Sequence, residues 1–303
     1  MLKLFFKSIA FIFGIAIIVL LVFNTCNIAL CKNILYKTSN DTNLIVLGHS
    51  HTECSIDDKL IDGAINLSQS ADTYFYTYFK LKKMVEANKS ISKVMLVYTN
   101  NMLSQDRDNW IYTGQYLSSK LPKYAHLLQA KDWYVIFRHG QPGNVANTLL
   151  KIFQNNLYSC IANNNSQLYK EFKWGGYLFL VRDSIPKEIF LYKEMATKEY
   201  NVTINNKSAT STNIKYLVKI AEYCKQNNLK LILIRPPLFS LYDKYYDSEL
   251  HNMLNNELAG IEFIDYSNCK LKDDEFGDFE HLNYRGANAF TKILLHYIKC
   301  KYL

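Results

Sequence analysis

Residues 44–51 read LIVLGHSH, an unbroken apolar run that is followed by a glycine, two histidines and a serine. The apolar residues 44–47 are typical of a strand that is buried on both faces of a parallel sheet. The polar residues behind them indicate a sharp turn. We therefore predict that Ser50 lies at the tip of a turn after the first strand of the domain.

A second polar segment lies some 230 residues further along the chain, where residues 278–283 read DFEHLN. It places a carboxylate, Asp278, three residues before an imidazole, His281. Serine is a weak nucleophile at neutral pH and needs a positioned base. Histidine serves as that base when a carboxylate holds its tautomer and stabilises the imidazolium. The two segments together supply all three groups.

The rest of the domain alternates between strand and helix. Apolar runs predict further strands at residues 64–67, 94–98, 229–234 and 261–265. Helical periodicity predicts helices that start near Asp72, near Ser211 or Thr212, at Asp247 and near Ala287. This alternation predicts an α/β fold, a three-layer α/β/α sandwich around a five-stranded parallel sheet.

The fold places the candidate residues together. In parallel sheets of this kind, the site lies beyond the carboxyl ends of the strands. Ser50 follows the first strand and Ser68 the second, Asn100 and Asn101 follow the third, and the loop that carries Asp278 and His281 follows the fifth. All of these groups are therefore expected on one rim of the sheet.

The N-terminus differs from the rest of the chain. Residues 8–23 are uncharged and apolar, and with their flanks they approach the ~20 residues that span a bilayer. We expect residues 1–25 to be an uncleaved transmembrane anchor. Lys3 and Lys7 favour a cytoplasmic N-terminus, which puts the catalytic domain outside the cytoplasm, on the periplasmic or cell-surface side. A signal or lipoprotein peptide and a buried core helix are the alternatives.

Three further segments complete the expected organisation. Residues 26–42 are expected to form a polar stalk, and residues 43–303 the α/β domain. Within that domain, about 103–210 carries all three tryptophans and few periodic stretches, which indicates an insertion that forms a cap or a substrate wall. Irregular helices of the same domain are the alternative.

Composition narrows the class of partner. The 303 residues are 49% hydrophobic and carry a formal charge of +8. The lysines are scattered, and no zinc-finger or Arg-rich pattern occurs, so no nucleic-acid partner is expected.

The seven cysteines show no metal-site or disulfide spacing. The acidic residues between 273 and 280 lack the spacing of a calcium loop and are expected to form a solvated loop. We expect no cofactor and no metal.

The chain resembles the SGNH (GDSL-like) hydrolase superfamily. Its first block, usually Gly-Asp-Ser or Gly-Ser-Ser, corresponds to GHS at residues 48–50, and its last block, Asp-x-x-His-Leu-Asn before a Gly-Ala helix start, corresponds to DFEHLNYRGA at residues 278–287. In the family's second block a glycine usually follows Asn-Leu, whereas here Ser68 follows that pair. The third block usually reads Gly-x-Asn-Asp, whereas here residues 98–101 read YTNN. The resemblance covers roughly residues 43–100 and 229–300, and it is strongest to membrane-tethered bacterial members that handle acyl groups on cell-surface polymers.

The resemblance implies a role for each candidate residue. Ser50 would be the nucleophile, His281 its base and Asp278 the group that orients the base. The backbone N–H groups of Ser50 and Ser68 and the side-chain amide of Asn100 would form an oxyanion hole. His51 and Asn101 are candidates for substrate contact, with a structural role as the alternative for His51.

We therefore expect an extracytoplasmic serine esterase or O-acyltransferase that acts on acyl (acetyl) esters of cell-envelope polysaccharide. Its partners would be an acylated glycan or another small acyl ester, the membrane, and a membrane-bound acyltransferase. One alternative is a catalytically weak binding or assembly protein of the cell envelope on the same scaffold. A lipase is a third, although the chain has no long apolar lid beyond its N-terminal run.

Overall fold

The computed structural model describes residues 36–104, 106–161, 174–183, 211–242 and 247–302, together with scattered positions between 6 and 22 and residues 185, 187 and 189. Most of the expected anchor at 1–25 and of the stalk at 26–42 lies outside these residues, as do parts of the expected insertion. Within the described part of the chain, no helix has both the length and the apolarity that a membrane crossing requires.

Five parallel strands form a single sheet with the order β2-β1-β3-β4-β5. They are β1 (Leu44–Leu47), β2 (Ala64–Asn66), β3 (Lys93–Val97), β4 (Lys230–Arg235) and β5 (Glu262–Asp265). The strands are short and apolar, and those in the middle of the sheet are buried on both faces, as parallel sheets require. The predicted five-stranded parallel sheet is confirmed.

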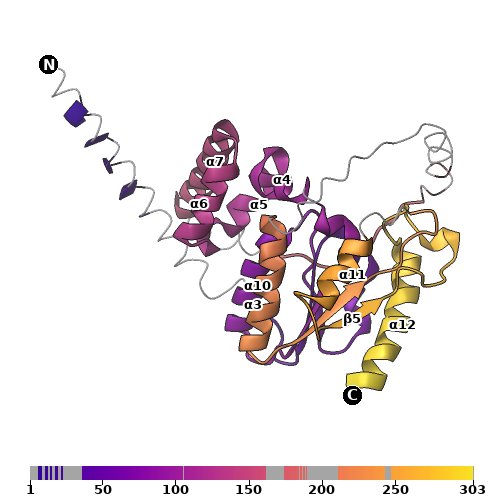
Figure 1. Cartoon of the computed structure of the whole chain (residues 1–303). Coiled ribbons are helices and arrows are strands. Elements are labelled where there is room, and N and C mark those ends of the chain that lie inside the picture. Colours follow the sequence, from indigo (N-terminus) through magenta and orange to yellow (C-terminus); the bar gives the residue numbers. More distant parts are fainter. Residues whose placement is uncertain are drawn as a thin grey trace. The chain divides into compact units, whose positions relative to one another are not determined.

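Helices cover both faces of this sheet (Figure 1). On one face, α3 (Tyr74–Ala87) packs against α10 (Thr212–Gln226). On the other, α12 (Tyr284–Tyr302) packs against the short helix α2 (Ser50–Ser55). The core below α12 combines apolar residues of the strands and of this helix, namely Leu44, Val46, Met95, Ile232, Ile234, Ile264, Phe290, Leu294 and Ile298.

Polar side chains fix the ends of two helices. Ser211 caps α10, as expected, and Asp108 accepts hydrogen bonds from the Ser211 hydroxyl and from the first N–H groups of that helix. Asn213 then caps α3, since its Oδ1 accepts from Tyr74 N at 2.7 Å. The expected cap Asp72 instead forms a buried ion pair with Lys80, at 2.6 Å, and the helix begins two residues later.

The chain divides into two compact units, and the sheet belongs to the unit made of Thr38–Ile111 and Trp174–Leu303. The remaining elements of that unit are η1 (Asp58–Leu60), η2 (Asn100–Leu103), α11 (Asp247–Asn255) and η5 (Asp273–Glu275), and α4 (Asp106–Tyr112) ends at its boundary. Residues 174–183, which were expected to be part of the insertion, also belong to this unit.

The other unit comprises Met1–Lys37 and Tyr112–Lys173. Its elements are α5 (Gly114–Tyr124), η3 (Ala125–Leu127), α6 (Ala130–His139) and α7 (Pro142–Ile161). Helices α5 and α7 pack together, and Leu117, Leu121, Ile136 and Val145 are buried. Tyr36 joins this unit through a hydrogen bond of 2.6 Å between its hydroxyl and His126 Nε2.

Candidate active site

The candidate site lies where the strand order reverses direction. From β1 the chain moves outward to β2 and then back across β1 to β3, so the carboxyl ends of β1 and β3 form a switch point, the usual place of a ligand site in open parallel sheets. Ser50 follows β1 and Asn100 follows β3. All the site residues discussed below belong to the sheet-containing unit.

Gly48 lets the chain turn tightly after β1. A Cβ atom at this position would lie 2.2 Å from Val97 Cγ1 and 2.6 Å from Thr52 Oγ1, and its φ of +156° is one that L residues rarely adopt. The glycine thus allows α2 to start close against β3. Ser50 is the first residue of that helix, whereas the sequence predicted a turn.

The Ser50 hydroxyl meets the His281 ring. Ser50 Oγ lies 2.8 Å from His281 Nε2. On the other side of the ring, Nδ1 lies 2.8 Å and 3.0 Å from the two carboxylate oxygens of Asp278. An ionised carboxylate only accepts hydrogen bonds, so Nδ1 carries the proton and Nε2 is left to accept the Ser50 hydroxyl proton. The three groups are therefore arranged for proton transfer from Ser50 to His281.

The Asp278 carboxylate is held from several directions. Its Oδ1 accepts the backbone N–H groups of Glu280 and His281, each at 2.8 Å. Its Oδ2 accepts from the Arg182 guanidinium, which comes from the segment 174–183. Since Asp278 is 7% exposed, these contacts fix the carboxylate in a protected position from which it orients the imidazole.

Two of the three expected oxyanion donors follow the neighbouring strands β1 and β3. Ser50 is the first residue of α2, and N–H groups in the first turn of a helix have no intrahelical acceptor. Asn100 starts η2 and is 2% exposed, at the carboxyl end of the neighbouring strand β3. Either group is of the type that stabilises a developing negative charge.

Ser68 is not available in the expected way. Its N–H already donates to Asn66 Oδ1 at 2.9 Å, so this donor is satisfied inside the protein. The prediction that Ser68 contributes an oxyanion N–H is therefore wrong for this arrangement. The physical reason is the side chain of Asn66, which closes a turn at this position.

Asn66 is a buried connector that sequence inspection did not single out as a site residue. Its Nδ2 donates to the backbone oxygens of Thr52 and Ile56, at 2.9 and 2.8 Å. Its Oδ1 accepts from Ser68 N. The side-chain amide of Asn66 thus links the end of α2, the helix that begins with Ser50, to the loop after β2 through hydrogen bonds.

His51 is a buried residue and not an exposed substrate contact. The residue is 2% exposed, and its Nε2 lies 3.2 Å from Glu280 Oε2 and 3.5 Å from Asn101 Nδ2. Its Nδ1 has no hydrogen-bond partner among the described residues. Burial lowers the pKa of His51, although the hydrogen bond to Glu280 opposes the shift. The alternative of a structural role fits this burial better than direct contact with substrate.

His49 connects the ends of two strands. Its Nε2 lies 3.1 Å from Thr99 Oγ1, and its Nδ1 accepts from His51 N at 3.4 Å. Burial lowers the pKa of His49 well below the ordinary value of 6.5, with a smaller contribution from the neighbouring His51. The neutral ring therefore acts as a fixed hydrogen-bonding group. The Thr99 hydroxyl in turn donates to Asn101 Oδ1 at 2.8 Å.

The segment 174–183 runs along the site. It belongs to the insertion that was expected to form a cap or a substrate wall, but the sequence did not single out any of its residues. Gly176 N donates to Ser68 O at 3.0 Å, Leu178 N donates to Glu53 O at 2.8 Å, and Leu180 O accepts from Tyr284 N at 3.0 Å. Phe179 stacks on the Tyr284 ring. Through these backbone hydrogen bonds the segment contacts the loop after β2, then α2, and then the start of α12. At that end Arg182 contacts Asp278.

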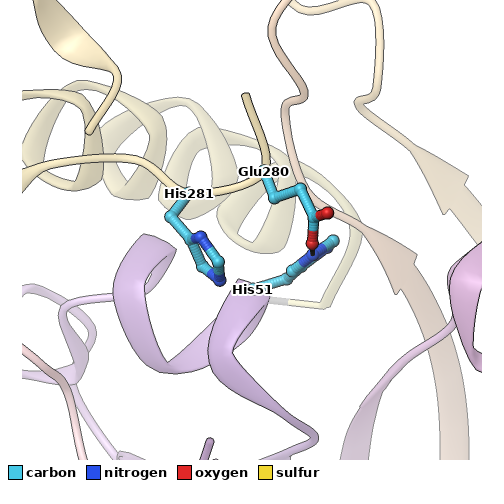
Figure 2. A group of neighbouring side chains, drawn as sticks. All are labelled: His51, Glu280 and His281. Atoms are coloured by element: carbon cyan, nitrogen blue, oxygen red, sulfur yellow. Dashed lines mark hydrogen bonds and ion pairs between the residues drawn. The ribbon is translucent and has the colours of Figure 1, made fainter. Parts of the chain in front are cut away.

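Glu280 also has a position that the sequence did not suggest. It was expected in a solvated loop, but it joins His51 and lies next to His281 (Figure 2). Burial alone would raise the pKa of Glu280, yet the hydrogen bond from His51 and the nearby cations lower it. His51, Glu280 and His281 each offer one ligand atom, and these atoms lie within 4.8 Å of one another, so they could hold a metal ion.

A cavity of about 500 Å³ lies elsewhere in the fold. Residues at the starts of β4 and β5, including Lys230, Leu231 and Glu262, line it together with residues of α10. These are the amino ends of the strands, whereas Ser50 and Asn100 follow carboxyl ends. The cavity is therefore separate from the candidate active site.

The chain is similar in part to a protein family and, in its structure, to a solved protein. One protein-family model, of an uncharacterised family, matches residues 177–302, which include Asp278 and His281 but not Ser50. No curated protein matches the chain. Among solved structures, a GDSL-like lipase from Bacteroides thetaiotaomicron VPI-5482 is similar, with 10% identity, a TM-score of 0.37, and coverage of 88% of this chain and 92% of that chain.

Proposed function

We propose that this protein is a serine esterase or O-acyltransferase in which Ser50 attacks an acyl carbonyl. The observation that carries the proposal is the continuous set of contacts from Ser50 Oγ to His281 Nε2, at 2.8 Å, and from His281 Nδ1 to Asp278, also at 2.8 Å. His281 takes the hydroxyl proton as the new ester bond forms, and the buried carboxylate stabilises the resulting imidazolium.

The negative charge that develops on the carbonyl oxygen needs hydrogen-bond donors. In the proposal these are the backbone N–H of Ser50 and the side-chain amide of Asn100, each of a kind worth roughly 3 kcal/mol in the transition state. His281 then returns its proton to the leaving group. The acyl group passes from Ser50 to water in an esterase, or to a sugar hydroxyl in a transferase.

The proposed substrate is an acyl ester, such as an acetyl ester, of cell-envelope polysaccharide. The apolar N-terminal run supports an anchored protein whose active site faces away from the cytoplasm, and the basic balance of the chain suits an anionic polymer or membrane surface. A membrane-bound acyltransferase is the proposed partner if the reaction is acyl transfer.

Acyl release from p-nitrophenyl acetate by the full chain tests the chemistry. Wild type should turn over this ester, and Ser50→Ala should lose at least about 1000-fold in kcat with an unchanged circular dichroism spectrum. Undiminished turnover in Ser50→Ala would rule out the mechanism. Analysis of products formed with and without an added oligosaccharide then separates hydrolysis from transfer.

A second candidate is a catalytically weak binding or assembly protein of the cell envelope. The observation that favours it is the hydrogen bond from Ser68 N to Asn66, because it removes one expected oxyanion donor. If the protein only binds, wild type should turn over no acyl ester. Wild type and Ser50→Ala should then bind a glycan with equal affinity.

A further inference from the structure

Three potential metal ligands converge beside Ser50. His51 is the second residue of α2, and Glu280 and His281 are consecutive residues of the loop before α12. Their ligand atoms lie within 4.8 Å of one another, and Figure 2 shows the three side chains turned toward a common region. The proposed acyl chemistry gives Glu280 no role beside His51 and His281.

The donor types indicate which ion would bind. Two imidazole nitrogens with one carboxylate form a set that suits Zn²⁺ and other first-row divalent ions, whereas Mg²⁺ and Ca²⁺ prefer oxygen ligands. Ligand atoms ~2.1 Å from a tetrahedral Zn²⁺ are separated by ~3.4 Å. His51 Nε2 and Glu280 Oε2 are 3.2 Å apart already. The wider separations, up to 4.8 Å, need a closure of up to ~1.4 Å.

Two of the three side chains are partly exposed. The Glu280 side chain is 43% exposed and the His281 side chain 18%, so an ion can approach from their side. The His51 side chain is 1% exposed and fixes the inner ligand. Because His51 Nδ1 makes no hydrogen bond within the described residues, it can take the ring proton when Nε2 binds the ion.

We infer that His51, Glu280 and His281 form a binding site for a divalent first-row transition ion, with Zn²⁺ as the best match. Because His281 Nδ1 faces Asp278 at 2.8 Å, the nitrogen left for the ion is Nε2, which also contacts the Ser50 hydroxyl. This nitrogen has one lone pair, so it either binds the ion or accepts the Ser50 proton. The ion therefore switches the serine off, a consequence that rests on the proposed function.

Isothermal titration calorimetry with ZnCl₂ and the full chain tests the binding site. Wild type should bind one Zn²⁺ at this site, and Glu280→Gln and His51→Asn should each weaken that binding at least tenfold. Ser50→Ala keeps all three ligands and removes the competing hydroxyl, so it should bind Zn²⁺ at least as tightly as wild type.

Two control variants separate this site from other ligands on the surface. Asp273→Asn makes the same charge change as Glu280→Gln, at an exposed position of the same acidic loop. His296→Gln removes a histidine whose Nε2 lies 3.7 Å from Cys300 Sγ on α12, a competing pair. Both variants should keep the affinity at the proposed site. Equal affinity in wild type and Glu280→Gln, or loss of all binding in His296→Gln, would overturn the inference.

Ester turnover then separates the two proposals. Saturating Zn²⁺ should abolish turnover of p-nitrophenyl acetate in wild type, and EDTA should restore it. Binding that depends on Glu280 in a protein without turnover would support the metal site and count against the acyl chemistry. Full turnover in the Zn²⁺-saturated protein would contradict the competition for His281.

Discussion

Arg182 donates to the same carboxylate, that of Asp278, which holds the His281 ring. The guanidinium comes from the segment 174–183, which binds the loop after β2, helix α2 and the start of α12 through backbone hydrogen bonds. The Arg182 side chain is 46% exposed, so the ion pair contributes little to stability in itself. Its effect is instead on the position of Asp278 and, through it, of the imidazole.

Arg182→Gln should therefore lower kcat for p-nitrophenyl acetate by about tenfold with little change in KM, because small misplacements of catalytic groups are costly. Arg182→Lys should recover part of the loss. Lys83→Gln is the matched control, since it removes one exposed cation that pairs with Glu86 on the surface of α3. Equal kcat values in Arg182→Gln and wild type would show that the contact does not position Asp278.

Asp278→Asn keeps the size of the side chain but removes its charge. The neutral amide no longer stabilises the imidazolium and can hold the wrong tautomer of His281, so kcat should fall by about 10³–10⁴. Steady-state kinetics measure the change, and the melting temperature checks the fold. A loss smaller than tenfold would mean that the carboxylate has no part in the chemistry.

The fold could be predicted because its strands are short apolar runs with clear ends. The predicted bounds of β1 match the structure. Those of β2 and β5 differ by one residue at one end, and those of β3 and β4 are shifted by one residue at both ends. Helix starts were harder to place. Asp72 has the composition of a cap, yet its carboxylate pairs with Lys80, eight residues ahead. That contact depends on the packing of the α3 face, which sequence periodicity does not describe.

The site could be predicted in part for a similar reason. Ser50 and the 278–281 loop are recognisable because each sits in a local pattern, and the parallel sheet brings the ends of its strands together. Glu280 and Arg182 have no such pattern. Their partners, His51 and Asp278, lie 229 and 96 residues away along the chain, so only the tertiary fold reveals the contacts. The occupied Ser68 N–H was missed because Asn66 closes its turn through a side chain.

Asn66→Ala should destabilise the protein by about 2–4 kcal/mol. The change leaves Thr52 O, Ile56 O and Ser68 N without the hydrogen bonds that Asn66 makes, and unsatisfied buried groups cost about 1–3 kcal/mol each. Chemical denaturation measures the free energy of unfolding. Asn252→Ala, on the exposed surface of α11, is the control and should change it by less than about 0.5 kcal/mol. Equal losses in the two variants would contradict the connecting role of Asn66.

Glu262 links β5 to the far end of α12. It accepts hydrogen bonds from Lys301, Tyr297 and Tyr302, and Lys230 lies 3.1 Å away. Burial opposes ionisation, but these partners outweigh it and lower the pKa of Glu262 from 4.5 to about 2. A lowered carboxyl pKa gives stability that is complete above the unfolded value and is lost as the pH falls toward the folded one.

Wild type should therefore lose unfolding free energy from this group as the pH falls from about 4.5 to 2. Glu262→Gln should be less stable at pH 7 and should lack this part of the acid dependence. Denaturant titrations of both proteins at several pH values give the comparison. Parallel pH profiles for the two proteins would show that Glu262 is not the group responsible.

The most direct test of the account is covalent capture of the serine. A fluorophosphonate probe reacts with a serine that a histidine has activated, and mass spectrometry of the digested protein identifies the modified peptide. The account predicts one adduct at Ser50 in wild type and no adduct at that position in Ser50→Ala, and strongly slowed labelling in His281→Gln. An unmodified Ser50 in folded wild-type protein, or labelling of Ser50 at the same rate in His281→Gln, would contradict it.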